Sequence, residues 1–253
     1  MNVPALIALG GNTGDVRATF AAALRALDET PGVSMTAASR AYRTPAVGAN
    51  AGGEFLNAAA TLETTLSAHR LLDVLQRLET EAGRERITHW GPRSIDLDLI
   101  LFGEERIADG SLTVPHPGLA WRRFVLDPAC EVAGEWAEPG GVTLREYRER
   151  LLARPLRLGV KTEDAGFVAA LAGELDDPRR VAVEQWGPGR MSRRRPPTLW
   201  LVREDGERGA ERTAPTILLP AEPAAAVALL RDVLSAALPD PEPQPDGAPL
   251  WPC

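Results

Sequence analysis

The stretch from Trp90 to Phe102, WGPRSIDLDLILF, constrains the fold more than any other part of this sequence. A Gly-Pro turn leads into a segment whose side chains alternate between two kinds, as they do along a β-strand. One face is apolar and carries Ile95, Leu97, Leu99 and Leu101, whereas the other carries Asp96, Asp98 and then Ile100. The segment therefore predicts a strand with an apolar face and two neighbouring carboxylates on the opposite face.

Two carboxylates held two residues apart on one strand face repel each other, so the pair is costly unless a cation bridges them. Mg²⁺ suits such a pair because it takes one or two carboxylates and binds water and phosphate oxygens at its other positions. Taken alone, Asp-x-Asp is more often a solvated acidic strand face. Arg84, Arg86 and Arg93 lie just upstream, and carboxylates beside arginines are typical of sites that handle a nucleotide triphosphate.

The composition is that of a soluble globular protein, because 44% of the 253 residues are hydrophobic and 25% are charged. A formal net charge of −7 argues against nucleic-acid binding. The only lysine, Lys161, is not part of a Gly-Lys-Ser/Thr sequence, which excludes a P-loop. Cys130 and Cys253 are far apart and lack metal-type spacing, which favours a reduced, cytoplasmic setting. We find neither a signal peptide nor an apolar run of membrane-spanning length, and expect no membrane association.

The first part of the chain predicts a regular succession of elements. These are a strand at 3–9, a helix at 15–27, a strand at 33–42, a strand at 54–63 and a helix at 67–82. Gly10–Asp15 lacks the G-x-G-x-x-G spacing, so we interpret it as a tight turn before a capped helix. Residues 44–53 are rich in Gly, Ala and Pro and predict a flexible loop, a candidate lid.

Both a structural and a binding interpretation are open for three residues, namely Phe55, Phe124 and His116. Phe55 and Asn57 share one face of the strand at 54–63, where a ring beside a carboxamide could stack on and recognise a flat heterocycle, although Phe55 alone is more often core. Phe124 lies in the segment 121–126, which predicts an apolar strand preceded by two arginines, and is either core or the second half of an aromatic sandwich. His116 ends a short strand at 112–116 and is either a loop histidine bonded to backbone or a ligand contact.

The order strand–helix–strand–strand–helix–strand predicts a ferredoxin-like α+β sandwich, an antiparallel sheet with helices packed on it. A polar helix at 143–153 closes this domain, which we place at residues 1–156. Residues 157–238 predict a small α+β segment, with helices near 163–175 and 223–238 and strands near 181–185, 198–202 and 216–219. Residues 239–253 are rich in proline and predict a disordered tail.

Six segments, in the order in which they occur, resemble the 6-hydroxymethyl-7,8-dihydropterin pyrophosphokinase family. They are ALGGNTGD, YRTPAVG, FLNAA, LQRLETEAGRER, WGPRSIDLDLILFG and LTVPHP with the downstream RRFVL. The resemblance extends from residue 3 to about residue 153. It implies a folate-pathway enzyme that moves the β,γ-diphosphate of ATP to the hydroxymethyl group of the pterin and releases AMP. The expected partners are these two small molecules, and the expected assembly is a monomer or a homodimer.

The resemblance also implies a role for each matching residue. The catalytic residues would be Arg84, Arg93, Asp96 and Asp98, the two aspartates holding two Mg²⁺ ions. The pterin would be bound by Thr44, Pro45, Val47, Phe55, Asn57, Trp90 and Phe124. The nucleotide would be bound by Gln76, Glu79, Arg86, Thr113, His116 and Arg122.

Three features depart from the family pattern. Phe55 stands where some members carry tyrosine, Ser111 stands where some place an arginine, and the loop at 84–90 is shorter than usual. An alternative is a catalytically silent sensor of pterin or nucleotide, regulated through the C-terminal segment. Retention of both aspartates and of Arg84 and Arg93 favours the enzyme, since a sensor needs no metal and phosphate clamp.

The sequence after about residue 153 has no functional interpretation. A fused second folate enzyme is one idea, but the segment is short for one and no catalytic cluster stands out. Every residue with an implied role lies between Thr44 and Phe124. We therefore expect the C-terminal segment to be dispensable for the chemistry.

Overall fold

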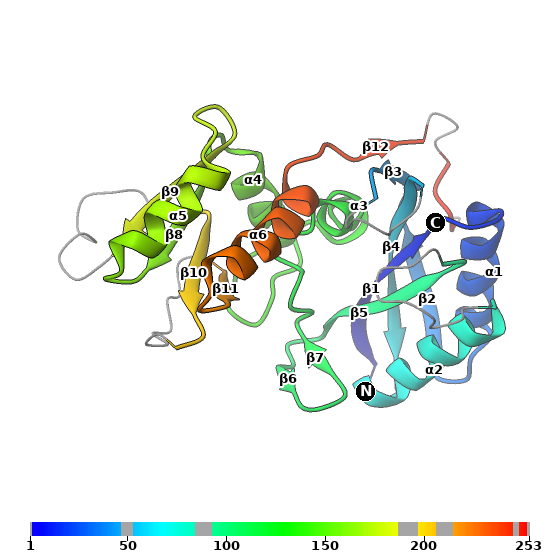
Figure 1. Cartoon of the computed structure of the whole chain (residues 1–253). Helices are drawn as coiled ribbons and strands as arrows, with labels where there is room; N and C mark the ends of the chain where they lie inside the picture. Colours follow the sequence, from blue (N-terminus) through cyan, green and yellow to red (C-terminus); the bar gives the residue numbers. More distant parts are fainter. Residues whose placement is uncertain are drawn as a thin grey trace. The chain divides into compact units, whose positions relative to one another are not determined.

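A computed structural model of the chain describes residues 2–46, 53–83, 93–186, 197–205, 215–244 and 248–251 (Figure 1). The chain forms two compact units. Unit 1 comprises Met1–Arg148 together with Pro239–Cys253, and unit 2 comprises Glu149–Leu238. Along the chain, unit 2 is therefore inserted between two segments of unit 1. The predicted division into 1–156, 157–238 and 239–253 differs from this, because it separates the last residues from the first unit.

Unit 1 is built on a six-stranded antiparallel sheet in the order β12-β3-β4-β1-β5, with β2 also paired to β4. Its strands are β1 (Val3–Gly11), β2 (Val33–Ala38), β3 (Tyr42–Thr44), β4 (Phe55–Thr64), β5 (Asp96–Phe102) and β12 (Glu242–Pro243). The predicted strand at 33–42 is thus two strands, and β4 is long enough to pair with both. An antiparallel sheet with helices packed on it confirms the predicted ferredoxin-like α+β fold.

Helices α1 (Val16–Asp28) and α2 (Ala68–Glu81) cover one face of this sheet, and α3 (Arg123–Ala133) lies against the other (Figure 1). The first two begin where their capping residues predict. The side chain of Asp15 accepts a hydrogen bond from the backbone of α1, and that of Ser67 accepts one from the backbone of α2. Buried leucines and Phe20 on these helices pack against the sheet and form the main core of unit 1.

The alternation of side chains predicted for β5 decides on which face of the sheet the two aspartates lie. Leu97 and Leu99 belong to the core shared with α1 and α2, so Asp96 and Asp98 lie on the opposite face, the one that α3 covers in part. A register shift in the pairing of β1 with β5 interrupts the alternation farther along the strand. As a result Phe102, and not Leu101, joins this core cluster.

The strand predicted at 121–126 is wrong, because this segment leads into α3. Val125, Leu126, Ala129 and Ala133 are buried, and this spacing marks one face of a helix. The short apolar run at the start of α3 has no periodicity that separates a strand from a buried helix. The helix predicted at 143–153 is confirmed as α4 (Leu144–Leu152). The strand predicted at 112–116 is reduced to β7 (Thr113–Val114), which pairs with β6 (Ile107–Ala108).

The tail predicted to be disordered contributes an edge strand to unit 1. β12 pairs antiparallel with β3, and Leu250 and Trp251 pack against the core. Proline is compatible with an edge strand because one side of that strand needs no hydrogen-bond donor. The expectation that the first domain is complete by about residue 153 is therefore wrong, since its sheet ends on a strand from the other end of the chain.

Unit 2 contains a four-stranded sheet in the order β11-β10-β8-β9, and every neighbouring pair in it is parallel. The elements are β8 (Leu156–Lys161), α5 (Ala165–Leu175), β9 (Val181–Trp186), β10 (Leu199–Arg203), β11 (Thr216–Leu219) and α6 (Pro223–Ala237). The mixed helix and strand content was predicted, but β8, which lies between β10 and β9, was not. Within the described ranges, no helix of either unit combines the length and apolarity needed to cross a membrane.

Candidate active site

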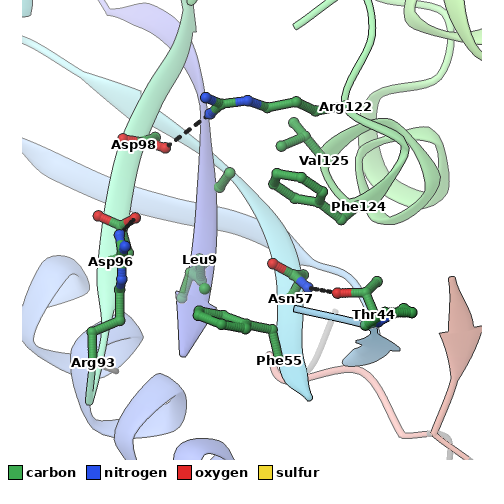
Figure 2. Close-up of a pocket in the computed structure, with 13 residues that line it drawn as sticks. Leu9, Thr44, Phe55, Asn57, Arg93, Asp96, Asp98, Arg122, Phe124 and Val125 are labelled. Carbon is green, nitrogen blue, oxygen red and sulfur yellow. Dashed lines mark hydrogen bonds and ion pairs between the residues drawn. The ribbon is translucent and has the colours of Figure 1, made fainter. Parts of the chain in front are cut away.

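A cavity of unit 1 opens on the sheet face opposite α1 and α2 (Figure 2). It is lined by Ala8, Leu9, Gly10, Thr44, Pro45, Phe55, Asn57, Arg93, Asp96, Asp98, Arg122, Phe124 and Val125. Its space, open solvent included, is about 600 Å³, and pockets for small molecules measure roughly 300–1,000 Å³. The fold therefore brings predicted site residues from four separate segments to one place.

One end of the cavity has the shape of a slot for a flat ring. Phe55 on β4 and Phe124 on α3 lie on opposite sides of it, with the Asn57 side chain between them (Figure 2). Asn57 Nδ2 donates a hydrogen bond of 2.7 Å to Thr44 Oγ1, and both side chains are buried. This bond holds the amide in one orientation and leaves its carbonyl oxygen toward the cavity (Figure 2). The slot can thus stack a heterocycle and accept a hydrogen bond from its edge.

The other end of the cavity carries the two carboxylates of β5. The side chain of Asp96 is 24% exposed and that of Asp98 is 37% exposed, so both carboxylates are open to a ligand. Within the described ranges, no group of three or more His, Cys, Asp or Glu side chains is placed to hold a metal ion. Two hard oxygen donors do fit Mg²⁺, provided that water and phosphate oxygens complete its coordination.

Arg93 connects the two ends of the cavity. Its Nη1 forms an ion pair with Asp96 Oδ2, and its guanidinium carbon lies 6.0 Å from the centroid of the Phe55 ring. The backbone of Arg93 is held by Asn12, whose Oδ1 accepts its N–H at 2.9 Å and whose N–H donates to its carbonyl at 3.0 Å. Sequence reasoning missed Asn12, although it stands within the segment ALGGNTGD.

Arg122 and His116 both lie near Asp98. Arg122 Nη1 lies 3.9 Å and His116 Nε2 lies 4.0 Å from Asp98 Oδ2. Burial, reinforced by the Arg122 cation, lowers the pKa of His116 to about 4, so the ring is neutral near neutral pH. The Gly118 N–H donates to His116 Nδ1, which leaves the ring proton on Nε2, the nitrogen nearer to Asp98. Burial also lowers the pKa of Arg122, against the opposing effect of the Asp98 and Asp96 carboxylates.

Strand β1 ends in two glycines, the first of which lines the cavity. The prediction of a turn beginning at Gly10 is wrong, because β1 continues to Gly11 and Gly10 lines the cavity. A Cβ atom on Gly11 would lie 2.6 Å from the carbonyl oxygen of Ser94. Only glycine therefore lets β1 run this close to the segment that carries Arg93 into β5.

Arg122 lines this cavity, but four other predicted nucleotide-binding residues that the structure describes do not, namely Gln76, Glu79, Thr113 and His116. Glu79 is buried in α2, and its Oε1 accepts a hydrogen bond of 2.7 Å from the N–H of Leu97, which lies between the two aspartates. Glu79 therefore fixes the outer edge of β5. Gln76 and Thr113 are exposed on α2 and β7. Four predicted residues lie outside the described ranges, namely Val47, Arg84, Arg86 and Trp90.

Four cavity residues were not predicted from the sequence as site residues. They are Ala8, Leu9, Gly10 and Val125. Apolar residues in a strand or helix have the same pattern whether they face a core or a cavity, so only the packed structure distinguishes them.

The profile of the 7,8-dihydro-6-hydroxymethylpterin-pyrophosphokinase family matches residues 6–134. The 2-amino-4-hydroxy-6-hydroxymethyldihydropteridine pyrophosphokinase of Methylorubrum extorquens is 40% identical over 147 residues, which are 58% of this chain and 92% of that protein. The protein of the same name from Bacillus subtilis is 42% identical over 132 residues, 52% of this chain and 79% of its own length. The family match includes every residue that lines the cavity.

A solved structure of Plasmodium falciparum HPPK-DHPS aligns with 81% of this chain at 10% identity and a TM-score of 0.46. This chain spans 57% of that protein. A likeness of this size is too weak to identify unit 2.

Proposed function

The chain belongs to the 7,8-dihydro-6-hydroxymethylpterin-pyrophosphokinase family, and we propose that the cavity of unit 1 is the place where its two substrates meet. The protein is an ATP-dependent pyrophosphokinase of folate biosynthesis, which transfers diphosphate from ATP to the hydroxymethyl group of the dihydropterin and releases AMP. In this proposal the aromatic slot binds the pterin, and the carboxylate pair binds the triphosphate of ATP.

The pterin occupies the slot between Phe55 and Phe124. Its flat ring system stacks on both phenyl rings, and its edge donates a hydrogen bond to the carbonyl oxygen of Asn57. The bond from Asn57 to Thr44 supports this role because it fixes the amide before the ligand arrives. Thr44 and Pro45 line this subsite, and the family resemblance implies that Val47 contributes to it.

The triphosphate lies over β5. Asp96 and Asp98 would hold Mg²⁺, two ions in our proposal. The bound metal would supply positive charge that neutralises and orients the phosphate oxygens. Arg93 and Arg122 contribute two more positive charges from the cavity walls. Each now faces an aspartate, and phosphate oxygens are equally good partners for a guanidinium. Arg84 and Arg86 complete the charge neutralisation, as the family resemblance implies.

The chemistry needs positioning more than it needs a protein nucleophile. The pterin hydroxymethyl oxygen attacks the β-phosphorus, the bond from that phosphorus to the α,β-bridging oxygen breaks, and AMP departs with the bridging oxygen. The hydroxyl proton passes to water. His116 serves as a hydrogen-bond donor through Nε2 and not as a base, since its pKa is lowered to about 4 and its Nδ1 already accepts the Gly118 N–H.

One observation carries this proposal: the carboxylate pair with its arginines and the aromatic slot with Asn57 open into the same cavity. The test is to incubate the purified chain with ATP, Mg²⁺ and 6-hydroxymethyl-7,8-dihydropterin and to identify the nucleotide formed. We expect AMP in equal amount to the pterin diphosphate. Pterin-dependent ADP would overturn the assignment, and tight binding of both ligands without any turnover would favour the silent sensor.

The setting of the reaction is also a proposal. The two widely separated cysteines favour a reducing compartment, so we place the enzyme in the cytoplasm. A monomer or a homodimer remains the prediction from the sequence.

A further inference from the structure

The end of the chain is attached to the strand that carries Thr44. β12 pairs with β3 so that Glu242 lies opposite Arg43 and Pro243 opposite Tyr42. The Gln244 N–H donates a hydrogen bond of 2.9 Å to the carbonyl of Ala41. Because peptide groups alternate along a strand, Pro243 falls where an N–H would point away from β3. The proline-rich sequence thus fits an edge strand without losing a hydrogen bond to the sheet.

The same segment is attached to the helix that carries Phe124. Arg123 Nη1 donates a hydrogen bond of 2.7 Å to Asp240 Oδ1, and the same guanidinium binds Asp127 at 2.8 Å. The side chain of Arg123 is only 3% exposed, whereas that of Asp240 is 83% exposed. Asp127 also binds Arg148, so Asp240 balances the second positive charge in this group of four. Burial lowers the pKa of Arg123, but the bonds to Asp127 and Asp240 raise it above its ordinary value.

These two attachments act on opposite walls of the slot. Arg123 lies between Arg122 and Phe124 in the chain, and both of these neighbours line the cavity. The contacts of Arg123 therefore fix the backbone that orients the side chains of Arg122 and Phe124. On the other side β3 ends at Thr44, which holds the Asn57 amide. A third contact joins the two walls directly, since Glu131 on α3 accepts hydrogen bonds from Arg40 and from Tyr42 on β3.

We propose that residues 239–244 form a positioning strap for the pterin slot, with Asp240 setting α3 and the β12 backbone setting β3. The proposal rests on the assignment of the slot to the pterin. It gives the end of the chain a role in the reaction of unit 1, in place of the dispensability expected from the sequence.

The first test removes the charge of Asp240 with Asp240→Asn in the full chain. We expect the KM for the pterin, and its dissociation constant by calorimetry, to rise between about 3-fold and about 10-fold, because the pair joins a buried guanidinium to an exposed carboxylate. The turnover number and the KM for ATP should change less. Asp240→Glu keeps the charge and should restore much of the pterin affinity. The matched control is Asp73→Asn, which breaks an exposed arginine pair on α2.

The second test removes one backbone donor. Gln244→Pro deletes the N–H that binds Ala41, whereas Gln244→Ala removes the same side chain and keeps that N–H. We expect weaker pterin binding in the proline variant only. The two tests address different attachments, so failure of one variant to fold leaves the other informative.

Wild-type protein measured in parallel distinguishes failure of the assigned function from failure of the strap proposal. If the wild type neither forms AMP nor binds the pterin, the assigned function is wrong, and the strap is wrong with it. With an active wild type, the strap is wrong if Asp240→Asn and Gln244→Pro bind pterin as their controls do. It is also wrong if they lower only the melting temperature or the active fraction, since that result would describe a stabilising tail without influence on the slot.

Discussion

Replacement of Asp98 by asparagine should abolish the reaction and leave the fold intact. The side chain of Asp98 is 37% exposed, and its Oδ2 lies 3.9 Å from the Arg122 guanidinium and 4.0 Å from the neutral His116 ring. Exposed ion pairs of this kind contribute up to about 1 kcal/mol. The repulsion from Asp96 on the same strand face opposes that contribution and is of similar size. The free energy of unfolding should therefore change by less than about 1 kcal/mol.

The effect on turnover should be far larger. A metal ligand that supports phosphoryl transfer stabilises the transition state by several kcal/mol. A loss of about 4 kcal/mol corresponds to a roughly 1,000-fold fall in turnover, since each 1.36 kcal/mol is tenfold. Asparagine keeps the size of the side chain, so the comparison isolates the charge. The substitution should therefore change turnover far more than it changes the free energy of unfolding.

The assay combines steady-state AMP formation with urea unfolding in the metal-free protein, for wild type, Asp98→Asn and the exposed control Asp73→Asn. Turnover within about tenfold of wild type would mean that the carboxylate pair is only a solvated strand face. A loss of stability above about 3 kcal/mol would instead make Asp98 a structural residue. Either result would refute the reasoning from the cavity geometry.

Three further predictions concern neighbouring features of unit 1. Asn57→Ala should raise the KM for the pterin at least about tenfold with a smaller effect on the KM for ATP, measured with each substrate varied, because the amide fixes the slot and its loss leaves Thr44 without a donor. Burial raises the pKa of Glu131, but the bonds from Arg40 and Tyr42 outweigh it and lower that pKa below its usual value. The resulting stability is present above the usual carboxyl range and is lost as the pH falls through it, so Glu131→Gln should lose less stability than wild type in urea titrations between neutral pH and about pH 3. Burial raises the pKa of the Cys130 thiol to about 11, so iodoacetamide should label it roughly 100-fold more slowly than in urea-unfolded protein, as followed by peptide mass spectrometry. Equal labelling rates would contradict this reasoning.

Local patterns in the sequence determined the positions of several elements. The alternation after Ile95 placed Asp96 and Asp98 on one face of a strand, and the capping residues Asp15 and Ser67 located the starts of α1 and α2. These signals are local because the side-chain period and the unpaired N–H groups of a first turn depend only on nearby backbone. The six motifs, read together, also identified the family.

Only the tertiary structure decided which segments meet. The segment before Phe124 was taken for a strand, and nothing local indicates that a helix carries this ring to the side of the cavity opposite Phe55. The same holds for β8, which lies between two parallel strands, and for β12, which completes a sheet that begins at Val3. The partner of a short apolar run or a sheet edge is set by burial and hydrogen bonding between distant segments, and such partners leave no periodic trace in the run itself.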